Sequence, residues 1–179
     1  MTRCAMKAIS TARLTIRLLT LGDAAFIVAL LNDPDWLRFI GDKAVQTLDD
    51  ARRYLAEGPL AMYELHGFGL FAVERNSDRL TIGTCGLIGR DGLDDVDIGY
   101  AFLPEARGQG FALEAAHAVL EHGLRTISIN RIVAITDPDN AASTRVLERI
   151  GMRFERHLHM KDGANYVALY AIEAGPVAP

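Results

Sequence analysis

The sequence predicts an α+β domain built on a mixed β-sheet. Several short segments alternate apolar and polar residues with a period of two, as strands with one buried face do. Other segments carry apolar residues at spacings of three and four, as amphipathic helices do. Over residues 95–136 a long helical pattern separates two strand patterns, which indicates a parallel crossover. The other strands have connections typical of antiparallel pairs, so we expect a mixed sheet.

Composition places this sheet in one water-soluble domain. The chain has 179 residues, of which 50% are hydrophobic and 23% are charged, enough for a hydrophobic core. Its net charge of −4 argues against a general nucleic-acid binder. Cys4 and Cys85 match no metal or redox spacing, and no signal peptide or membrane span is visible, so we expect a cytoplasmic protein. We expect an arm at residues 1–12, the domain at 13–173 and a tail at 174–179.

The first third of the chain has the pattern of one strand followed by helices. The expected elements are a strand at 14–19, a helix at 22–31, a helical turn at 36–40 and a helix at 47–57. Asn32-Asp33-Pro34 ends the first helix, because proline cannot continue the hydrogen-bond ladder. Thr47, followed by Asp49 and Asp50, has the composition of a helix N-terminus. Gly58-Pro59 ends the helix that begins there.

The rest of the chain alternates strands with two helices. Strands are expected at 68–74, 80–89, 95–103, 131–136, 152–160 and 165–172, and helices at 108–126 and 140–150. Asn76-Ser77-Asp78 marks a hairpin between the first two of these strands. Asp139 or Asn140 caps the last helix, and Gly151 ends it. The domain is therefore expected to have about seven strands and about four helices.

A glycine-rich turn joins the strand at 95–103 to the long helix. It reads Arg107-Gly108-Gln109-Gly110-Phe111-Ala112. Backbone N–H groups at a helix N-terminus point outward, where the helix dipole favours an anion. Gly108 and Gly110 permit conformations and a close approach that other residues block. The turn lacks the Lys-Ser/Thr ending of a P-loop and the three-glycine spacing of a dinucleotide site. On these residues alone it is either a phosphate site or an ordinary connection.

Two motifs around this turn resemble those of the GNAT acetyltransferases. Arg107-x-x-Gly110-x-Ala112 fits their acyl-CoA motif. The chain is similar in particular to the RimJ/RimL-type branch, through Asp97-Ile98-Gly99-Tyr100, Pro104-Glu105, Glu114-Ala115, Asn140-Ala141-Ala142-Ser143, Leu147-Glu148-Arg149 and Gly151-Met152. The resemblance covers about residues 13–173. It implies a GNAT fold with splayed middle strands. It also implies an N-acetyltransferase, an acyltransferase that moves an acetyl group from acetyl-CoA to a primary amine.

The resemblance also implies where acetyl-CoA binds. Its pyrophosphate would rest on residues 107–112, and its pantetheine would pair with the backbone of Phe102 and Leu103, where an amide could also hold the reaction's oxyanion. Ordinary strand pairing is the alternative for these two residues. In RimL-like proteins the positions of Asn140 and Ser143 contact the cofactor, with the serine beside the sulfur. Both residues also suit a helix N-terminus. Many other members use a tyrosine seven residues after the asparagine, which this chain lacks.

Asp97 is the candidate general base. It shares a strand face with Gly99 and Ala101, whose small side chains leave a slot for a ligand against the sheet. A carboxylate there could take the proton of an attacking amine, directly or through water. The family more often carries the longer glutamate at this position. The alternative is a carboxylate that orients the substrate amine or ends the strand.

The acceptor site is less defined than the cofactor site. Trp36 and His66 are candidates to line it, together with a loop at 161–164; packing for Trp36 and no role for His66 are the alternatives. His157 and His159 share a strand face, but no third ligand clusters with them, so we expect no metal.

The expected partners follow from the same resemblance. The acceptor is a protein or peptide N-terminus or a small-molecule amine, with no nucleic acid and no membrane involved. The protein is expected to be a monomer or a homodimer. A CoA-binding module that does no chemistry is the alternative function.

Overall fold

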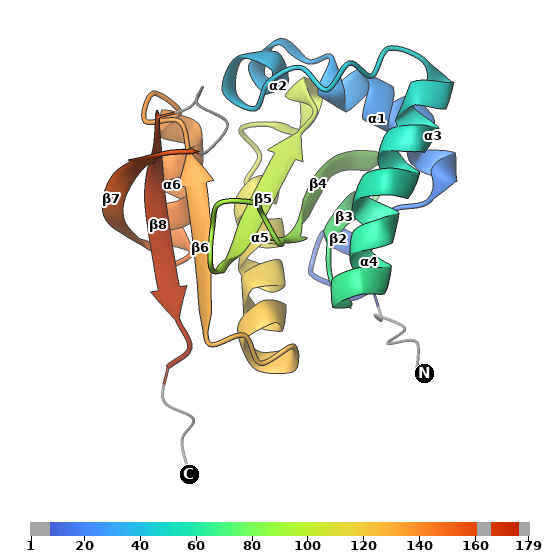
Figure 1. Ribbon diagram of the computed structural model, residues 1–179. Coiled ribbons are helices and arrows are strands. Elements are labelled where there is room, and N and C mark those ends of the chain that lie inside the picture. Colours follow the sequence, from blue (N-terminus) through green and yellow to red (C-terminus); the bar gives the residue numbers. More distant parts are fainter. Residues whose placement is uncertain (1–7, 161–165, 176–179) are drawn as a thin grey trace.

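One eight-stranded sheet organises the computed structural model, which describes residues 8–160 and 166–175 (Figure 1). The strands are β1 (Ile9–Ser10), β2 (Leu14–Leu18), β3 (Leu70–Arg75), β4 (Thr81–Ile88), β5 (Val96–Phe102), β6 (Arg131–Thr136), β7 (Arg153–His159) and β8 (Tyr166–Glu173). Their order across the sheet is β1-β2-β3-β4-β5-β6-β8-β7. All neighbours are antiparallel except β5 and β6, which are parallel. The expected mixed α+β fold is confirmed, while the acceptor-side loop expected at 161–164 lies outside the described residues.

Helices cover both faces of the sheet. They are α1 (Ala24–Leu31), α2 (Pro34–Phe39), α3 (Leu48–Leu55), α4 (Ala61–His66), α5 (Phe111–Glu121) and α6 (Ala141–Arg149). α5 lies on one face and α3 with α4 on the other, while α2 lies across the end where β5 and β6 finish (Figure 1). No helix in the described part of the chain has the length and apolar composition needed to cross a bilayer.

Side-chain alternation along the central strands divides the core between these two faces. On β3, Phe71 and Val73 join the large cluster that contains α5, whereas Ala72 packs with the N-terminal helices. On β5, Ile98 and Phe102 belong to the α5 side. Because side chains alternate along a strand, Asp97, Gly99 and Ala101 face the N-terminal helices, while Tyr100 shares the face of Ile98. The slot expected beside Asp97 is therefore on the helix-covered face opposite α5.

Strand β1 is the one strand that the sequence pattern does not predict. Ile9 and Ser10 pair with β2, so the described part of the expected arm includes a short strand. Arg13, just before β2, holds this end to α5 through an ion pair in which its Nε lies 2.7 Å from Oε2 of Glu114. Two residues are too few to display a periodic pattern, which is why the sequence gives no signal here.

The helix expected to stop at Gly58-Pro59 continues to His66. Helix α3 runs through a π-helical segment, Ala56–Leu60, directly into α4. In an α-helix Pro59 would lose a hydrogen bond and clash with a carbonyl one turn earlier. The wider π turn shifts the hydrogen-bond pattern by one residue, so it can accommodate the proline. Gly67, with φ of 75°, ends the helix instead. The predicted stop is therefore wrong, and α3 and α4 form a continuous wall beside the sheet.

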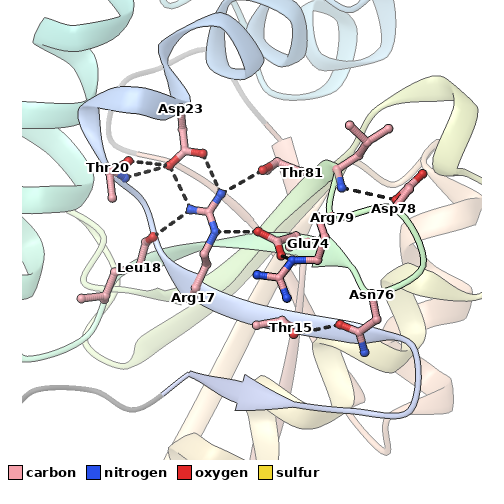
Figure 2. Close-up of polar contacts among 11 residues, drawn as sticks. Thr15, Arg17, Leu18, Thr20, Asp23, Glu74, Asn76, Asp78, Arg79 and Thr81 are labelled. Carbon is pink, nitrogen blue, oxygen red and sulfur yellow. Dashed lines mark hydrogen bonds and ion pairs between the residues drawn. The ribbon is translucent and has the colours of Figure 1, made fainter.

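Arg17 ties the first long strand to α1 and to the neighbouring hairpin (Figure 2). Its guanidinium lies 2.9 Å from Asp23 and 3.1 Å from Glu74, and it donates to Thr81 Oγ1 at 3.0 Å. Burial alone would raise the pKa of Asp23, but hydrogen bonds from Arg17 and from Thr20 outweigh it and hold that pKa below its ordinary value. The two mostly buried carboxylates are thus compensated by a shared cation.

The middle of the sheet opens between β5 and β6. Their parallel pairing joins Val96 with Ile132 and Asp97 with Val133, and no further pair is recorded between them. Beyond this point the two strands diverge toward α2 (Figure 1). The splayed middle strands expected from the family resemblance are therefore confirmed.

Candidate active site

The glycine-rich turn has the backbone geometry that the sequence predicts. Gly108 and Gly110 both adopt left-handed conformations, with φ of 72° and 81°, which side chains other than glycine rarely tolerate. Helix α5 begins directly afterwards, at Phe111. The N–H groups of its first turn have no partner within the helix. The turn therefore presents backbone donors at the positive end of a helix dipole.

The side chains of this turn are bound to the protein itself. Arg107 forms ion pairs with Asp33 and Asp35, and its Nε donates to the Phe102 carbonyl at 2.9 Å. Gln109 donates to the carbonyl of Glu105 at 2.7 Å. An anion at the turn would therefore meet the backbone before it meets either side chain. Arg107 instead connects the turn to α2, because Asp33 also caps that helix.

A groove of about 670 Å³ runs between this turn and the start of α6. Arg107, Gly108, Gly110, Phe111 and Ala112 all line it, and Gln109 does not. Two further basic residues line the same groove, which the sequence analysis missed: Arg145 and Arg149 on α6. Their spacing of four on one helix was the available signal, since such residues share a face.

The backbone of β5 is partly committed to the sheet. The N–H of Leu103 donates to the carbonyl of Ile82 at 2.9 Å, and the Phe102 carbonyl accepts from Arg107. Neither group is free for a ligand in this arrangement. The Leu103 N–H has the ordinary strand pairing weighed as an alternative, whereas the Phe102 carbonyl accepts from a side chain.

The start of α6 brings a serine and a tyrosine together. Asn140 caps the helix by accepting a hydrogen bond from the Ser143 N–H at 3.1 Å, as expected. The Tyr100 hydroxyl, reaching from β5, lies 3.1 Å from Ser143 Oγ and 3.1 Å from the Ser143 carbonyl. Burial raises the pKa of Tyr100 far above its ordinary value, against the opposing effect of the hydrogen bond to Ser143. The Tyr100 hydroxyl therefore keeps its proton at neutral pH. Its position beside Ser143 was not predicted from the sequence.

An inner cavity of about 340 Å³ continues from the groove where β5 and β6 separate. Both spaces share the same lining residues at their junction: Trp36, Phe39, Ile40, Tyr100, Ala101, Asn140 and Ser143. The inner cavity also reaches Asp97 and Gly99, as the small-residue slot predicts. The glycine-rich turn and the candidate base therefore lie at two ends of one connected space.

Asp97 is a buried carboxylate at the inner end of this space. Its side chain is 1% exposed, and Arg90 holds its Oδ2 with contacts of 2.8 and 2.7 Å. The other oxygen, Oδ1, has no hydrogen-bond partner within the described residues. Burial raises the pKa of Asp97 to about 6, although the Arg90 charge lowers it. A carboxylate with this pKa can accept a proton near neutral pH.

The two remaining candidates, Trp36 and His66, differ in their position: one lines the groove and the inner cavity, and the other lines neither. Trp36 is buried, donates from Nε1 to the Gly41 carbonyl at 3.1 Å, and lines both spaces. His66 ends α4, stacks on Phe68 and lines neither space. Among the residues that the structure describes, no cluster of His, Cys, Asp or Glu has the composition of a metal site.

Comparison with known proteins agrees with this geometry. The family model described as an acetyltransferase (GNAT) domain matches residues 13–153. An uncharacterized N-acetyltransferase, YnaD of Bacillus subtilis (strain 168), is 31% identical over 147 residues, which cover 82% of this chain and 83% of YnaD. The fold and site thus define an acetyltransferase domain. The chain belongs to the GNAT acetyltransferase family.

Solved structures extend the agreement to the whole fold. A GNAT-family acetyltransferase from Bacillus anthracis has a TM-score of 0.78 at 27% identity, covering 94% of this chain and 99% of that one. The microcin C7 self-immunity acetyltransferase MccE, solved in complex with acetyl-CoA and AMP, has a TM-score of 0.76 at 16% identity, covering 91% and 93%. The expected GNAT fold is confirmed. The finer likeness to the RimJ/RimL-type branch stays a prediction.

Proposed function

We propose that this protein transfers an acetyl group from acetyl-CoA to a primary amine, by direct attack within a ternary complex. One observation carries the proposal. A single connected space runs from the glycine-rich turn, past Ser143, to Asp97. It therefore joins a site for phosphate, a hydroxyl donor and a proton acceptor in the order that amine acetylation needs.

The cofactor would lie along the outer part of this space. Its pyrophosphate rests on the backbone of residues 107–112, with Arg145 and Arg149 within the same groove. Its pantetheine passes between β5 and β6, where the two strands no longer pair with each other. The thioester then lies beside Ser143. This arrangement supports the cofactor positions expected from the sequence, with backbone rather than the Arg107 side chain as the main phosphate partner.

The inner part of the space supports the chemistry. Asp97 takes a proton from the ammonium of the acceptor, through a water molecule because its own side chain is 1% exposed. The neutral amine attacks the thioester carbon, the carbon–sulfur bond breaks, and the acetyl group stays on the nitrogen as an amide. The nitrogen gives up its second proton in this step. The departing thiolate accepts a hydrogen bond from Ser143 and takes up that proton, which gives free CoA. Tyr100 holds the Ser143 hydroxyl in place.

An acyl-enzyme route has less support than direct attack. Cys85 is the thiol on the central sheet, and it is fully buried. Burial raises its pKa far above the ordinary value, so the nucleophilic thiolate is not populated at neutral pH. It does not line the connected space.

The proposal is tested by following release of the CoA thiol from acetyl-CoA in the presence of primary amines and peptides. We expect release that depends on both the protein and the amine, with a matching amount of acetylated product by mass spectrometry. Binding of acetyl-CoA without amine-dependent release would instead identify a CoA-binding module that does no chemistry. No binding of acetyl-CoA would refute both readings.

A further inference from the structure

We infer that the acceptor is a compact primary amine with an uncharged apolar body, such as an arylalkylamine, rather than a polypeptide N-terminus or a polyamine. The inference rests on the proposed function and identifies the substrate class of the same site. Three properties of the inner cavity carry it: its walls, its charges and its size.

The walls on the acceptor side are apolar and largely aromatic. Helix α2 contributes Trp36 and Phe39, the α3–α4 wall contributes Tyr54 and Met62, and the sheet contributes Ile88. Burial raises the pKa of the Tyr54 hydroxyl, although the Arg90 charge lowers it, so this ring also stays uncharged at neutral pH. Such walls favour aliphatic or aromatic groups through the area they remove from water.

The charged groups of the cavity limit the acceptor to one ammonium group. Asp97 and Asp137 are the acidic residues among its described lining, and Lys43, which is exposed, and Arg90, which is bound to Asp97, are the basic ones. Asp137, on the connection from β6 to α6, lines the inner cavity but not the groove, and its carboxylate accepts from the Asp139 N–H at 2.8 Å. Asp97, at the inner end, is the proposed proton acceptor for one amine. A second cation on the acceptor would share the cavity with Lys43 and Arg90, and like charges repel.

The size of the cavity limits the acceptor further. Its volume of about 340 Å³ includes the junction at Asn140 and Ser143. Sites for drug-sized ligands span roughly 300–1,000 Å³, so the part left for the acceptor is smaller than a typical ligand site. α2 and the α3–α4 wall both border it. The chain of a polypeptide acceptor continues past its N-terminal residue, so it would need an exit from the cavity that is wide enough for its second residue.

A panel of matched amines tests the inference in the same thiol-release assay. We expect kcat/KM for 2-phenylethylamine to exceed that for spermidine and for a peptide with an N-terminal phenylalanine by at least about tenfold, because each of these adds polar or charged groups that the walls cannot pair. Phenylalanine itself adds one carboxylate to the same body and is expected to fall between them. Equal or faster acetylation of the peptide or of spermidine would overturn the acceptor class while leaving acetyl transfer intact. No turnover of any amine, with acetyl-CoA bound, would refute the proposed function itself.

A filled cavity gives an independent test. Met62→Trp adds volume at the acceptor end, away from the cofactor groove, so KM for 2-phenylethylamine should rise by about tenfold or more with the affinity for acetyl-CoA unchanged. Leu65→Trp, on the exposed side of the same helix, is the matched control and should behave like the wild type. Equal KM values for the two variants would contradict this position of the acceptor. Their unfolding curves show whether Met62→Trp is folded, and a smaller replacement, Met62→Phe, serves if it is not.

Discussion

The Tyr100 hydroxyl on β5 lies 3.1 Å from Ser143 Oγ at the first turn of α6, which links the two sides of the opening in the sheet. Removing the serine hydroxyl would remove the hydrogen bond that we propose it donates to the leaving sulfur. We expect Ser143→Ala to lower kcat by about 10- to 100-fold, with little change in the affinity for acetyl-CoA. Tyr100→Phe leaves that hydroxyl but frees its rotation, and we expect a loss of about three- to tenfold in kcat. Steady-state thiol release and cofactor titration measure both quantities.

Tyr166→Phe is the matched control for the tyrosine variant, because Tyr166 is 50% exposed and lines neither space. Its kcat should equal that of the wild type. An unchanged kcat in Ser143→Ala would remove the serine from the mechanism and leave Tyr100 with a packing role.

The raised pKa of Asp97 predicts an acidic limb in the pH profile. Only the carboxylate accepts a proton, so its contribution falls as the pH drops through about 6. We expect Asp97→Asn to lower kcat/KM by roughly 100-fold at pH 8. The ratio of wild-type to variant rates should rise from pH 5 to 7 and then level off. Using this ratio cancels the ionisation of the amine itself. A ratio that is flat with pH would exclude Asp97 as the base.

Arg90 sets the position of that limb. It holds Oδ2 of Asp97 at 2.7 Å and favours the charged carboxylate. In Arg90→Gln the pKa of Asp97 loses this lowering, so the acidic limb should move to higher pH by about one unit or more. The measurement is kcat/KM against pH with 2-phenylethylamine. A lower rate with an unmoved limb would mean that Arg90 contacts the substrate instead.

The shared cation of the Arg17 cluster predicts a large loss of stability. Asp23 and Glu74 are each 8% exposed at their side chains, and Arg17→Ala leaves the first without its cation. We expect the free energy of unfolding to fall by about 2–3 kcal/mol, somewhat less than for a fully buried pair. Urea unfolding at pH 7 measures it. Arg52→Ala removes an exposed ion pair with Asp49 and should change stability by less than about 0.5 kcal/mol.

The same cluster gives the wild type a defined acid sensitivity. The folded pKa of Asp23 lies below its ordinary value of 3.8. Its stabilising contribution is therefore fully present above the unfolded pKa and is lost as the pH falls through the lower, folded pKa. Unfolding free energies measured from pH 7 to 3 should decline mainly below pH 4. A decline that is complete by pH 5 would assign the loss to another group.

Arg145 and Arg149 are predicted to bind the phosphates of the cofactor. Replacing either by glutamine should weaken acetyl-CoA binding by about three- to tenfold while leaving kcat at saturation unchanged. The weakening should shrink as salt is raised, since exposed charges are screened. Arg156→Gln, at an exposed position on β7 outside the groove, is the control. An equal effect of all three replacements would indicate a general effect of the protein's net charge on acetyl-CoA binding rather than specific contacts with the phosphates.

Local patterns predicted most of the fold and only part of the site. Thr47 and Asp50 form the expected helix cap, and the parallel pair of β5 and β6 follows from the long helix between them. The helix end predicted at Pro59 was wrong because a proline normally ends an α-helix, and no local signal indicates the π turn that accommodates it here. Ile9 and Ser10 form a strand too short to have a period.

The features of the site that the sequence did not indicate come from contacts between distant parts of the chain. Arg107 fits a phosphate-binding motif, but its charge is taken up by Asp33 and Asp35, more than seventy positions earlier in the sequence. Tyr100 meets Ser143 because its side chain and α6 lie on the same face of the sheet. No rule of sequence spacing predicts either of these contacts. Both depend on the completed fold, so sequence patterns alone could not supply them.

We expect the opening between β5 and β6 to affect how long the folded protein lasts. The two strands pair with each other only at Val96–Ile132 and Asp97–Val133. A bound pantetheine, which carries amide groups of its own, would complete the interrupted ladder. Such a ligand binds the folded chain alone, so its binding free energy adds to the resistance against unfolding. The supply of cofactor would then govern the protein's turnover by proteases as well as its rate of reaction.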